Sequence, residues 1–227
     1  MKTLLCIPLL LLTPLFTQAA PILITGTPAD DSTLPNTPAS PKLGGFLINF
    51  DSLPSCSSFP PSGCTDYSGN TFSGITISSP DGLYAIPYSA QTAPNELFDN
   101  SAMGSANITI TTAVGVTGIG VGIADSDMAG PDPVNIFLQP LNASHTALGS
   151  PFTITIPETG SNPGNGYFVI EDTTSDIFGL KITQPVSDVS FSGLAIDDVQ
   201  VTPEPSTFLL LSAGAAVFGA LRLRKRA

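Results

Sequence analysis

The sequence has no tryptophan, one histidine and only seven basic residues among 227. Against 18 acidic residues, this scarcity of lysine and arginine gives a net charge of −11, which repels nucleic acid and anionic lipid surfaces. A Ser-His-Asp triad has no support, because the lone His145 lies in a polar stretch without a nucleophile elbow. The sequence also has no phosphate-binding loop and no Cys/His cluster, so the common catalytic and cofactor motifs are missing.

Helical patterns are also missing between the two termini. With 22 prolines, 21 glycines and no tryptophan, a helical bundle is unfavourable. Short runs with strand composition lie between Gly, Pro, Asn and Ser residues instead. These runs predict strands at 45–50, 73–79, 106–112, 116–124, 134–139, 152–156, 167–171, 178–183, 189–194 and 195–201. The predicted fold class is all-β, a two-sheet sandwich of the jelly-roll type, with a signal helix before it and a short transmembrane helix after it.

One predicted strand alternates apolar residues with glycine. The run VTGIGVGIA at 116–124 therefore presents one face without side chains. A strand of this kind lets another chain segment approach its backbone closely, so we expect such a segment on that face.

The N-terminus has the pattern of a secretory signal peptide. Met1-Lys2 is a short basic start, residues 3–16 are apolar apart from prolines, and Thr17-Gln18-Ala19-Ala20 supplies small residues at the cleavage positions. Cleavage after Ala19 fits best, because cleavage one residue later would place a proline first in the mature chain. We therefore expect a signal peptide at residues 1–19.

The C-terminus has three parts within residues 203–227. Pro203, Glu204 and Pro205 interrupt regular structure, because proline lacks an N–H donor and has a fixed φ. The following run, Phe208–Leu221, is uncharged and has no polar face, so a membrane segment explains it better than an amphipathic helix. Its 14 residues span roughly 21 Å, less than the ~30 Å hydrocarbon core, which suits a temporary anchor. Four basic residues close the chain, namely Arg222, Arg224, Lys225 and Arg226.

This three-part end resembles the PEP-CTERM sorting signal of Gram-negative bacteria. The resemblance covers about 25 of the 227 residues. It implies recognition by an exosortase, removal of the tail and delivery to the cell surface or the extracellular polysaccharide, with the membrane segment serving as an anchor before processing. We therefore expect a signal peptide at 1–19, a flexible Pro/Thr/Ser-rich spacer at 20–43, a sandwich at 44–202 and the sorting signal at 203–227.

Processing would make the net charge more negative and leave two cysteines. Residues 20–202 carry two basic residues and 17 acidic ones, the 18 of the chain less Glu204, for a net charge of −15. Cys56 and Cys64 are an isolated close pair in an exported chain, which predicts a disulfide. A metal site is the less favoured alternative for this pair, because no histidine or second cysteine pair lies nearby.

The two ends of the predicted sandwich resemble a known pattern. INFDSLP at 48–54 and LAIDDVQV at 194–201 are similar to the first and last strands of many PEP-CTERM ectodomains and of jelly-roll carbohydrate-binding modules. The resemblance implies that these strands lie side by side, with a structural calcium at their junction. The matching positions are Asp51, Asp197 and Asp198.

The alternation of the last strand places Asp197 on one face with Ala195, Val199 and Val201. An aspartate on an apolar face is costly to bury unless a metal or hydrogen bonds compensate it. The alternative is a solvated aspartate at a strand end, or one that caps a neighbouring turn.

Weaker candidates remain for other sites. Asp125, Asp127 and Asp132 have a spacing that suits a cation, but a polar rim loop explains them as well. Tyr84 and Tyr88 could form a small stacking surface for sugar or simply pack in the core. Sequons at Asn107 and Asn142 are read as chance matches in a chain whose export signals look bacterial.

Two functions follow for the ectodomain. The first is a non-catalytic surface or matrix protein that associates with exopolysaccharide. The alternative is a secreted glycan-acting enzyme on the same fold, which would need two carboxylates across a cleft.

Overall fold

The computed structural model describes residues 20–25, 29–30, 46–48, 50–56, 63–87, 95–99, 105–125, 134–156, 164–174, 176–185 and 194–203. All regular structure in these ranges is β-strand, and the strands pair antiparallel throughout, so the predicted all-β class is confirmed. Within the same ranges, no helix is long and apolar enough to cross a membrane. The expected signal helix and transmembrane helix lie outside the described residues.

The strands of the described ranges are β1 (Ile22–Thr25), β2 (Ala29–Asp30), β3 (Phe46–Ile48), β4 (Asn70–Phe72), β5 (Ile75–Ser78), β6 (Leu83–Ile86), β7 (Glu96–Asp99), β8 (Asn107–Asp125), β9 (Val134–Leu141), β10 (Phe152–Ile156), β11 (Gly164–Glu171), β12 (Ile177–Thr183) and β13 (Leu194–Pro203). Most predicted strands coincide with one of these. Of the strand expected at 189–194, only Leu194 is described, and it begins β13.

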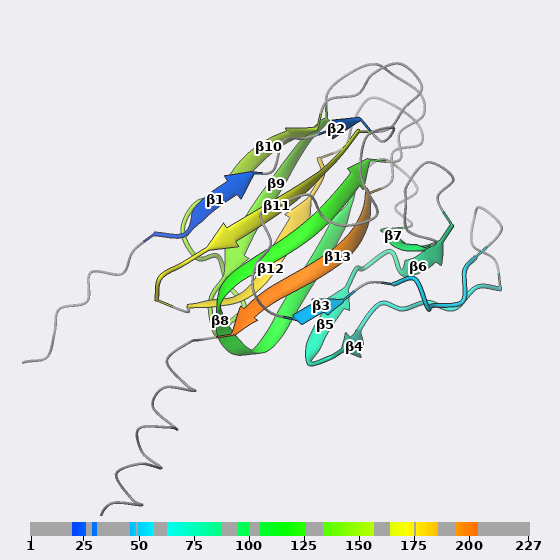
Figure 1. Cartoon of the computed structure of the whole chain (residues 1–227), viewed down its shortest axis with the longest axis horizontal. Helices are drawn as coiled ribbons and strands as arrows, with labels where there is room; N and C mark the ends of the chain where they lie inside the picture. Colours follow the sequence, from blue (N-terminus) through cyan, green and yellow to red (C-terminus); the bar gives the residue numbers. More distant parts are fainter. Residues whose placement is uncertain are drawn as a thin grey trace, which may run out of the picture.

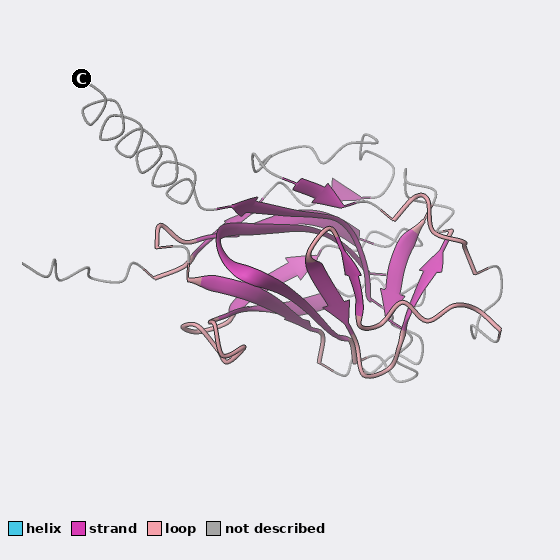
Figure 2. Cartoon of the chain, turned by 90° about the horizontal axis from the view of Figure 1, so that it is seen from below, coloured by secondary structure: helices cyan, strands magenta, loops and turns pink. Residues whose placement is uncertain are grey.

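The sheet curls into two layers because one long strand belongs to both (Figures 1 and 2). The first part of β8 lies between β12 and β5, which continue to β9, β10 and β4. Its second part lies between β11 and β13, which continue to β1, β2, β3 and β7. The two strands expected at 106–112 and 116–124 are therefore one strand, which changes partners around the exposed Val114 without breaking.

The core lies between the layers and follows the two-residue period of the strands. Ile75 and Ile77 alternate with half-buried residues on β5, and Ile108 and Ile110 do the same on the first part of β8. Phe50 is fully buried, and its ring meets that of Phe72 edge to face at 5.5 Å. Burial of this kind supplies most of the folding free energy of a domain.

The glycine-rich face of β8 has the close neighbour that the sequence predicts. A Cβ on Gly120 would meet the Tyr167 ring, with Cζ at 2.9 Å, and one on Gly122 would lie 3.0 Å from the backbone oxygen of Asp197. The Tyr167 side chain lies across this glycine-rich face and donates a hydrogen bond of 3.2 Å to Gln200 Oε1 on β13. Burial, and secondarily the charge of Asp198, raises the pKa of Tyr167.

The N-terminal segment differs from the expected spacer. Ile22–Thr25 pairs with β11, and Ala29–Asp30 extends the same edge, so these six residues are part of the sheet. Short strands such as β4, β6 and β7 were not predicted, because three or four residues contain too few alternations to give a clear period. The predicted disulfide between Cys56 and Cys64 is confirmed.

Candidate functional site

The sorting motif begins where the last strand of the sandwich ends. Pro203 is the final residue of β13 and lies opposite Val116 of β8. A proline at a strand end is tolerated, because no further ladder hydrogen bond is required of its nitrogen. Glu204 and Pro205 lie outside the described residues. Because Pro203 is itself the last residue of β13, no spacer separates the folded sheet from the start of the motif.

The three predicted calcium ligands come together at the junction of β3 and β13. β3 pairs with β13 through Ile48 and Val199, which confirms that the two strands lie side by side. Asp51 follows β3, and Asp197 and Asp198 lie on β13. Besides burial, the charges of Asp198 and Asp51 raise the pKa of Asp197, and the charge of Asp51 raises the pKa of Asp198.

A β-bulge sets the position of this acidic cluster, defined as Asp51, Asp197 and Asp198. On β13, Asp197 lies opposite Gly122 and Gln200 opposite Gly120, so β13 holds one more residue than β8 between these pairs. Asp198 has a φ of 48°, a conformation that aspartate tolerates better than most residues. The predicted shared face of Asp197 and Val199 is therefore wrong: Val199 packs in the core, and the extra residue rotates Asp197 away from it.

Burial is the main cause of the raised pKa values of Asp197 and Asp198. It raises the pKa of Asp197 to about 7, with the charge of Asp198 next in importance and that of Asp51 smaller. Hydrogen bonds from the backbone N–H groups of Asp198, at 2.8 Å, and of Phe50 act in the opposite direction. The pKa of Asp198 is also raised, first by burial and then by Asp51.

The cluster has the hard oxygen donors that calcium prefers. However, within the part of the chain that the structure describes, no group of three or more His, Cys, Asp or Glu side chains is arranged to hold a metal ion. Calcium at this junction stays a prediction.

The structure describes only some of the remaining candidates. Asp125 ends β8, while Asp127 and Asp132 lie outside the described residues, as does Tyr88. Tyr84 is half-buried on β6. His145 is exposed in a turn that the side chain of Asn142 organises by accepting hydrogen bonds from Ser144 and Thr146.

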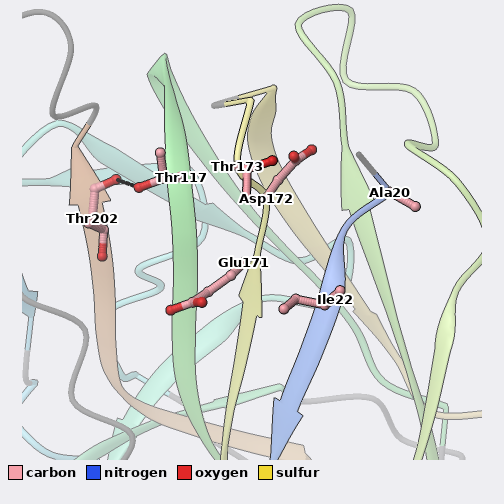
Figure 3. Close-up of a pocket in the computed structure, with 7 residues that line it drawn as sticks. All are labelled: Ala20, Ile22, Thr117, Glu171, Asp172, Thr173 and Thr202. Carbon is pink, nitrogen blue, oxygen red and sulfur yellow. Dashed lines mark hydrogen bonds between the residues drawn. The ribbon is translucent and has the colours of Figure 1, made fainter. Parts of the chain in front are cut away.

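A pocket that the sequence did not predict lies at one end of the sandwich. It has a volume of about 250 Å³ and is lined by Ala20, Ile22, Thr117, Glu171, Asp172, Thr173 and Thr202 (Figure 3). Thr117 donates a hydrogen bond of 3.3 Å to the backbone oxygen of Thr202, which closes one side. The only sequence signal was the run Glu-Asp-Thr-Thr directly after an apolar strand, which is typical of a side-chain-stabilised turn.

Asp172 is a buried side chain of this pocket, held by hydrogen bonds within its own turn. It is 4% exposed, and its Oδ1 accepts hydrogen bonds from the N–H and Oγ1 of Thr174, at 3.0 and 2.7 Å. Its Oδ2 is buried without a hydrogen-bond partner among the described residues.

The sequence of the C-terminal segment matches a known family model. The PEP-CTERM protein-sorting motif matches residues 201–226. The chain carries a PEP-CTERM sorting signal. This signal indicates an exported protein with a C-terminal anchor that an exosortase processes. No curated protein matches the chain.

Several solved structures are similar to parts of this chain, at low identity and with TM-scores below 0.5. The enzymatically active domain of tailspike protein 4 from bacteriophage CBA120 is 14% identical with a TM-score of 0.37, over 61% of this chain and 21% of that one. The K2 cleaved adhesin domain of Lys-gingipain is 14% identical with a TM-score of 0.42, over 71% and 99% of the two chains. A family 22 carbohydrate-binding module of Clostridium thermocellum Xyn10B is 13% identical with a TM-score of 0.36, over 62% and 91%. The chain thus spans about a fifth of the tailspike chain, and none of these similarities assigns a function.

Proposed function

We propose that this PEP-CTERM protein is a non-catalytic component of the bacterial cell surface or extracellular matrix, and that its jelly-roll-type sandwich associates with exopolysaccharide. The observation that carries the proposal is the sorting motif at 201–226, which continues β13 directly. The folded sheet is therefore the cargo that the sorting signal delivers.

The position of the chain ends supports delivery from a membrane. Ala20, at the start of the described ectodomain, and Thr202, near its end, line the same pocket. The start of β1 and the end of β13 lie toward the same end of the sandwich (Figure 1). A domain with this geometry can be attached at both ends to one membrane during export.

The charge supports a hydrated matrix environment. Residues 20–202 carry 17 acidic and two basic residues, a net charge of −15 once Glu204 is left out of the 18. Such a charge keeps a protein soluble and repels nucleic acid. Association with a neutral polysaccharide, or with an anionic one through divalent cations, is compatible with it.

A non-catalytic role agrees with the placement of the candidate acid–base groups. His145 is exposed in a turn, whereas a general base must be held within hydrogen-bond reach of its substrate. Glu171 and Asp172 are adjacent in sequence, and Asp172 is held by its own turn. The alternative, a secreted glycan-acting enzyme, predicts release of reducing sugar from host polysaccharide.

Sorting and binding are tested separately in the native host. The mature protein is isolated from wild-type cells and from cells that lack the exosortase, and its C-terminus is located by mass spectrometry. We expect no peptide beyond about Ser206 in wild-type cells and an intact tail in the deletion strain. Glu204→Ala should block processing, whereas the neighbouring Thr207→Ala should not. An intact Arg222–Ala227 segment on the wild-type surface protein would refute the proposed sorting.

The processed protein is then mixed with purified host exopolysaccharide and sedimented, and is applied to a glycan array. We expect co-sedimentation that is lost when the protein is unfolded by heat, with no reducing sugar released. Absence of binding to every glycan and to the host polysaccharide would refute the proposed association. Release of reducing sugar would favour the enzyme.

A further inference from the structure

We propose that the pocket at the end of the sandwich holds the α-amino group of the mature chain, which cleavage after Ala19 creates, and that this ammonium pairs with the carboxylate of Asp172. The inference rests on the predicted signal peptide and on the geometry of the pocket, and it is independent of glycan binding. Hydrolysis adds water across the Ala19–Ala20 peptide bond and leaves a carboxylate on Ala19 and an ammonium on Ala20.

The strand register brings the new terminus to the pocket. Ile22 lies opposite Glu171 in the antiparallel pair of β1 and β11. Continuing this register by two residues places Ala20 opposite Thr173, beside Asp172. Both Ala20 and Asp172 line the pocket, so the inferred proximity agrees with the described surface.

Asp172 has an oxygen available for this ammonium. Its Oδ1 is occupied by Thr174, whereas its buried Oδ2 has no hydrogen-bond partner among the described residues. A buried carboxylate oxygen without a donor is unfavourable. Figure 3 shows the Asp172 side chain on the side of β11 toward Ala20, whereas Glu171 points toward β8.

The precursor cannot supply the same group. Before cleavage, the nitrogen of Ala20 is a neutral amide with one N–H, and the next residue, Pro21, has no N–H at all. After cleavage, the same nitrogen carries a positive charge and three donors. It becomes one of three cationic groups in residues 20–202, beside Lys42 and Lys181. Lys181 lies within β12 opposite Thr109 and Gln139, away from this turn.

This ion pair would make the protein more stable once the signal peptide is removed. Among the described strands, the four-residue edge strand β1 pairs with β11 alone. A charge-assisted hydrogen bond at Ala20, two residues before this strand, would hold the strand in place. Removal of the signal peptide would therefore stabilise the pairing of β1 with β11.

The test uses the full gene expressed with export, so that the host removes the signal peptide. N-terminal sequencing should give Ala20 as the first residue. The α-amino pKa is then measured from ¹³C-dimethylated protein by NMR, and we expect it at least one unit above the ordinary range of about 7.7–8.0. Asp172→Asn should return it to that range, and Glu171→Gln should lower it less.

A second variant keeps the proposal testable if Asp172→Asn fails to fold. Two residues, Ser-Gly, are inserted between Ala19 and Ala20, so that the processed protein keeps every native side chain but moves its amine out of the pocket. We expect its melting temperature to fall by about 3–8 °C, and we expect no further fall when Asp172→Asn is added. A different N-terminus, an ordinary α-amino pKa in the wild type, or equal melting temperatures for wild type and insertion would each overturn the proposal, while leaving the sorting and binding experiments unaffected.

Discussion

Replacing Asp197 with asparagine should stabilise the protein at neutral pH. Burial and the neighbouring Asp198 raise the pKa of Asp197 to about 7 from its ordinary value of 3.8. Between these two pH values, the folded state holds a proton that the unfolded state has released. The stability that this carboxyl contributes is therefore complete below about pH 4 and is lost as the pH rises toward 7.

The size of the effect follows from the shift in pKa. Three pKa units correspond to ~4 kcal/mol, and partial access of water reduces this to roughly 2–4 kcal/mol. Asparagine keeps an acceptor oxygen for the N–H of Asp198, which bonds Asp197 Oδ1 at 2.8 Å. The substitution therefore removes the charge and preserves the local bulge.

The assay is thermal or urea unfolding of wild type, Asp197→Asn and a control at pH 4, 6 and 8, all in chelator. Wild type and Asp197→Asn should be nearly equal at pH 4, and the variant should melt roughly 4–16 °C higher at pH 8. Asp81→Asn, an exposed aspartate in a turn, should follow the wild type at every pH. A variant that is less stable than wild type at pH 8, or that shows the same pH slope, would refute this account of Asp197.

Three further predictions concern the ion, the disulfide and the glycine face. If calcium binds the cluster, melting should rise by an amount that corresponds to ~2.7 kcal/mol at 100 times the dissociation constant, and Asp197→Asn should abolish the rise; identical melting in calcium and chelator removes the site. Reduction of Cys56–Cys64, or the double serine variant, should cost roughly 2–3 kcal/mol in urea unfolding, and two free thiols in the unreduced protein would contradict the bridge. Gly120→Ala should lower the free energy of unfolding by about 1–3 kcal/mol, because its Cβ meets the Tyr167 ring. Adding Tyr167→Phe to this variant should recover part of that loss, and additive losses from the two substitutions would contradict the contact.

The extent of sequence-based prediction differs between the core strands and the edges. The apolar periods of β9, β10 and β12 were long enough to place these strands, because burial on one face requires alternation. The four-residue β5 was placed only because it lies within the longer alternating run at 73–79. The edge strand β1 was assigned to a spacer. Four residues next to prolines and threonines carry no periodic signal, and only pairing with β11 makes them a strand.

The all-β class, the disulfide and the sorting signal at 201–226 could be predicted without the structure, because each depends on local chemistry: strand period, two close cysteines, and a proline-flanked apolar run before basic residues. The close neighbour of the glycine face of β8 could also be predicted, but the identity of that neighbour, Tyr167, came from the fold. The separation of Asp197 from the face of Val199 could not be predicted, because it depends on one extra residue at Asp198 that reverses the alternation beyond it and appears only when β13 pairs with β8. The pocket at Asp172 could not be predicted either. Its lining residues Ala20, 171–173 and Thr202 are far apart in the sequence, and the folding of the strands brings them together.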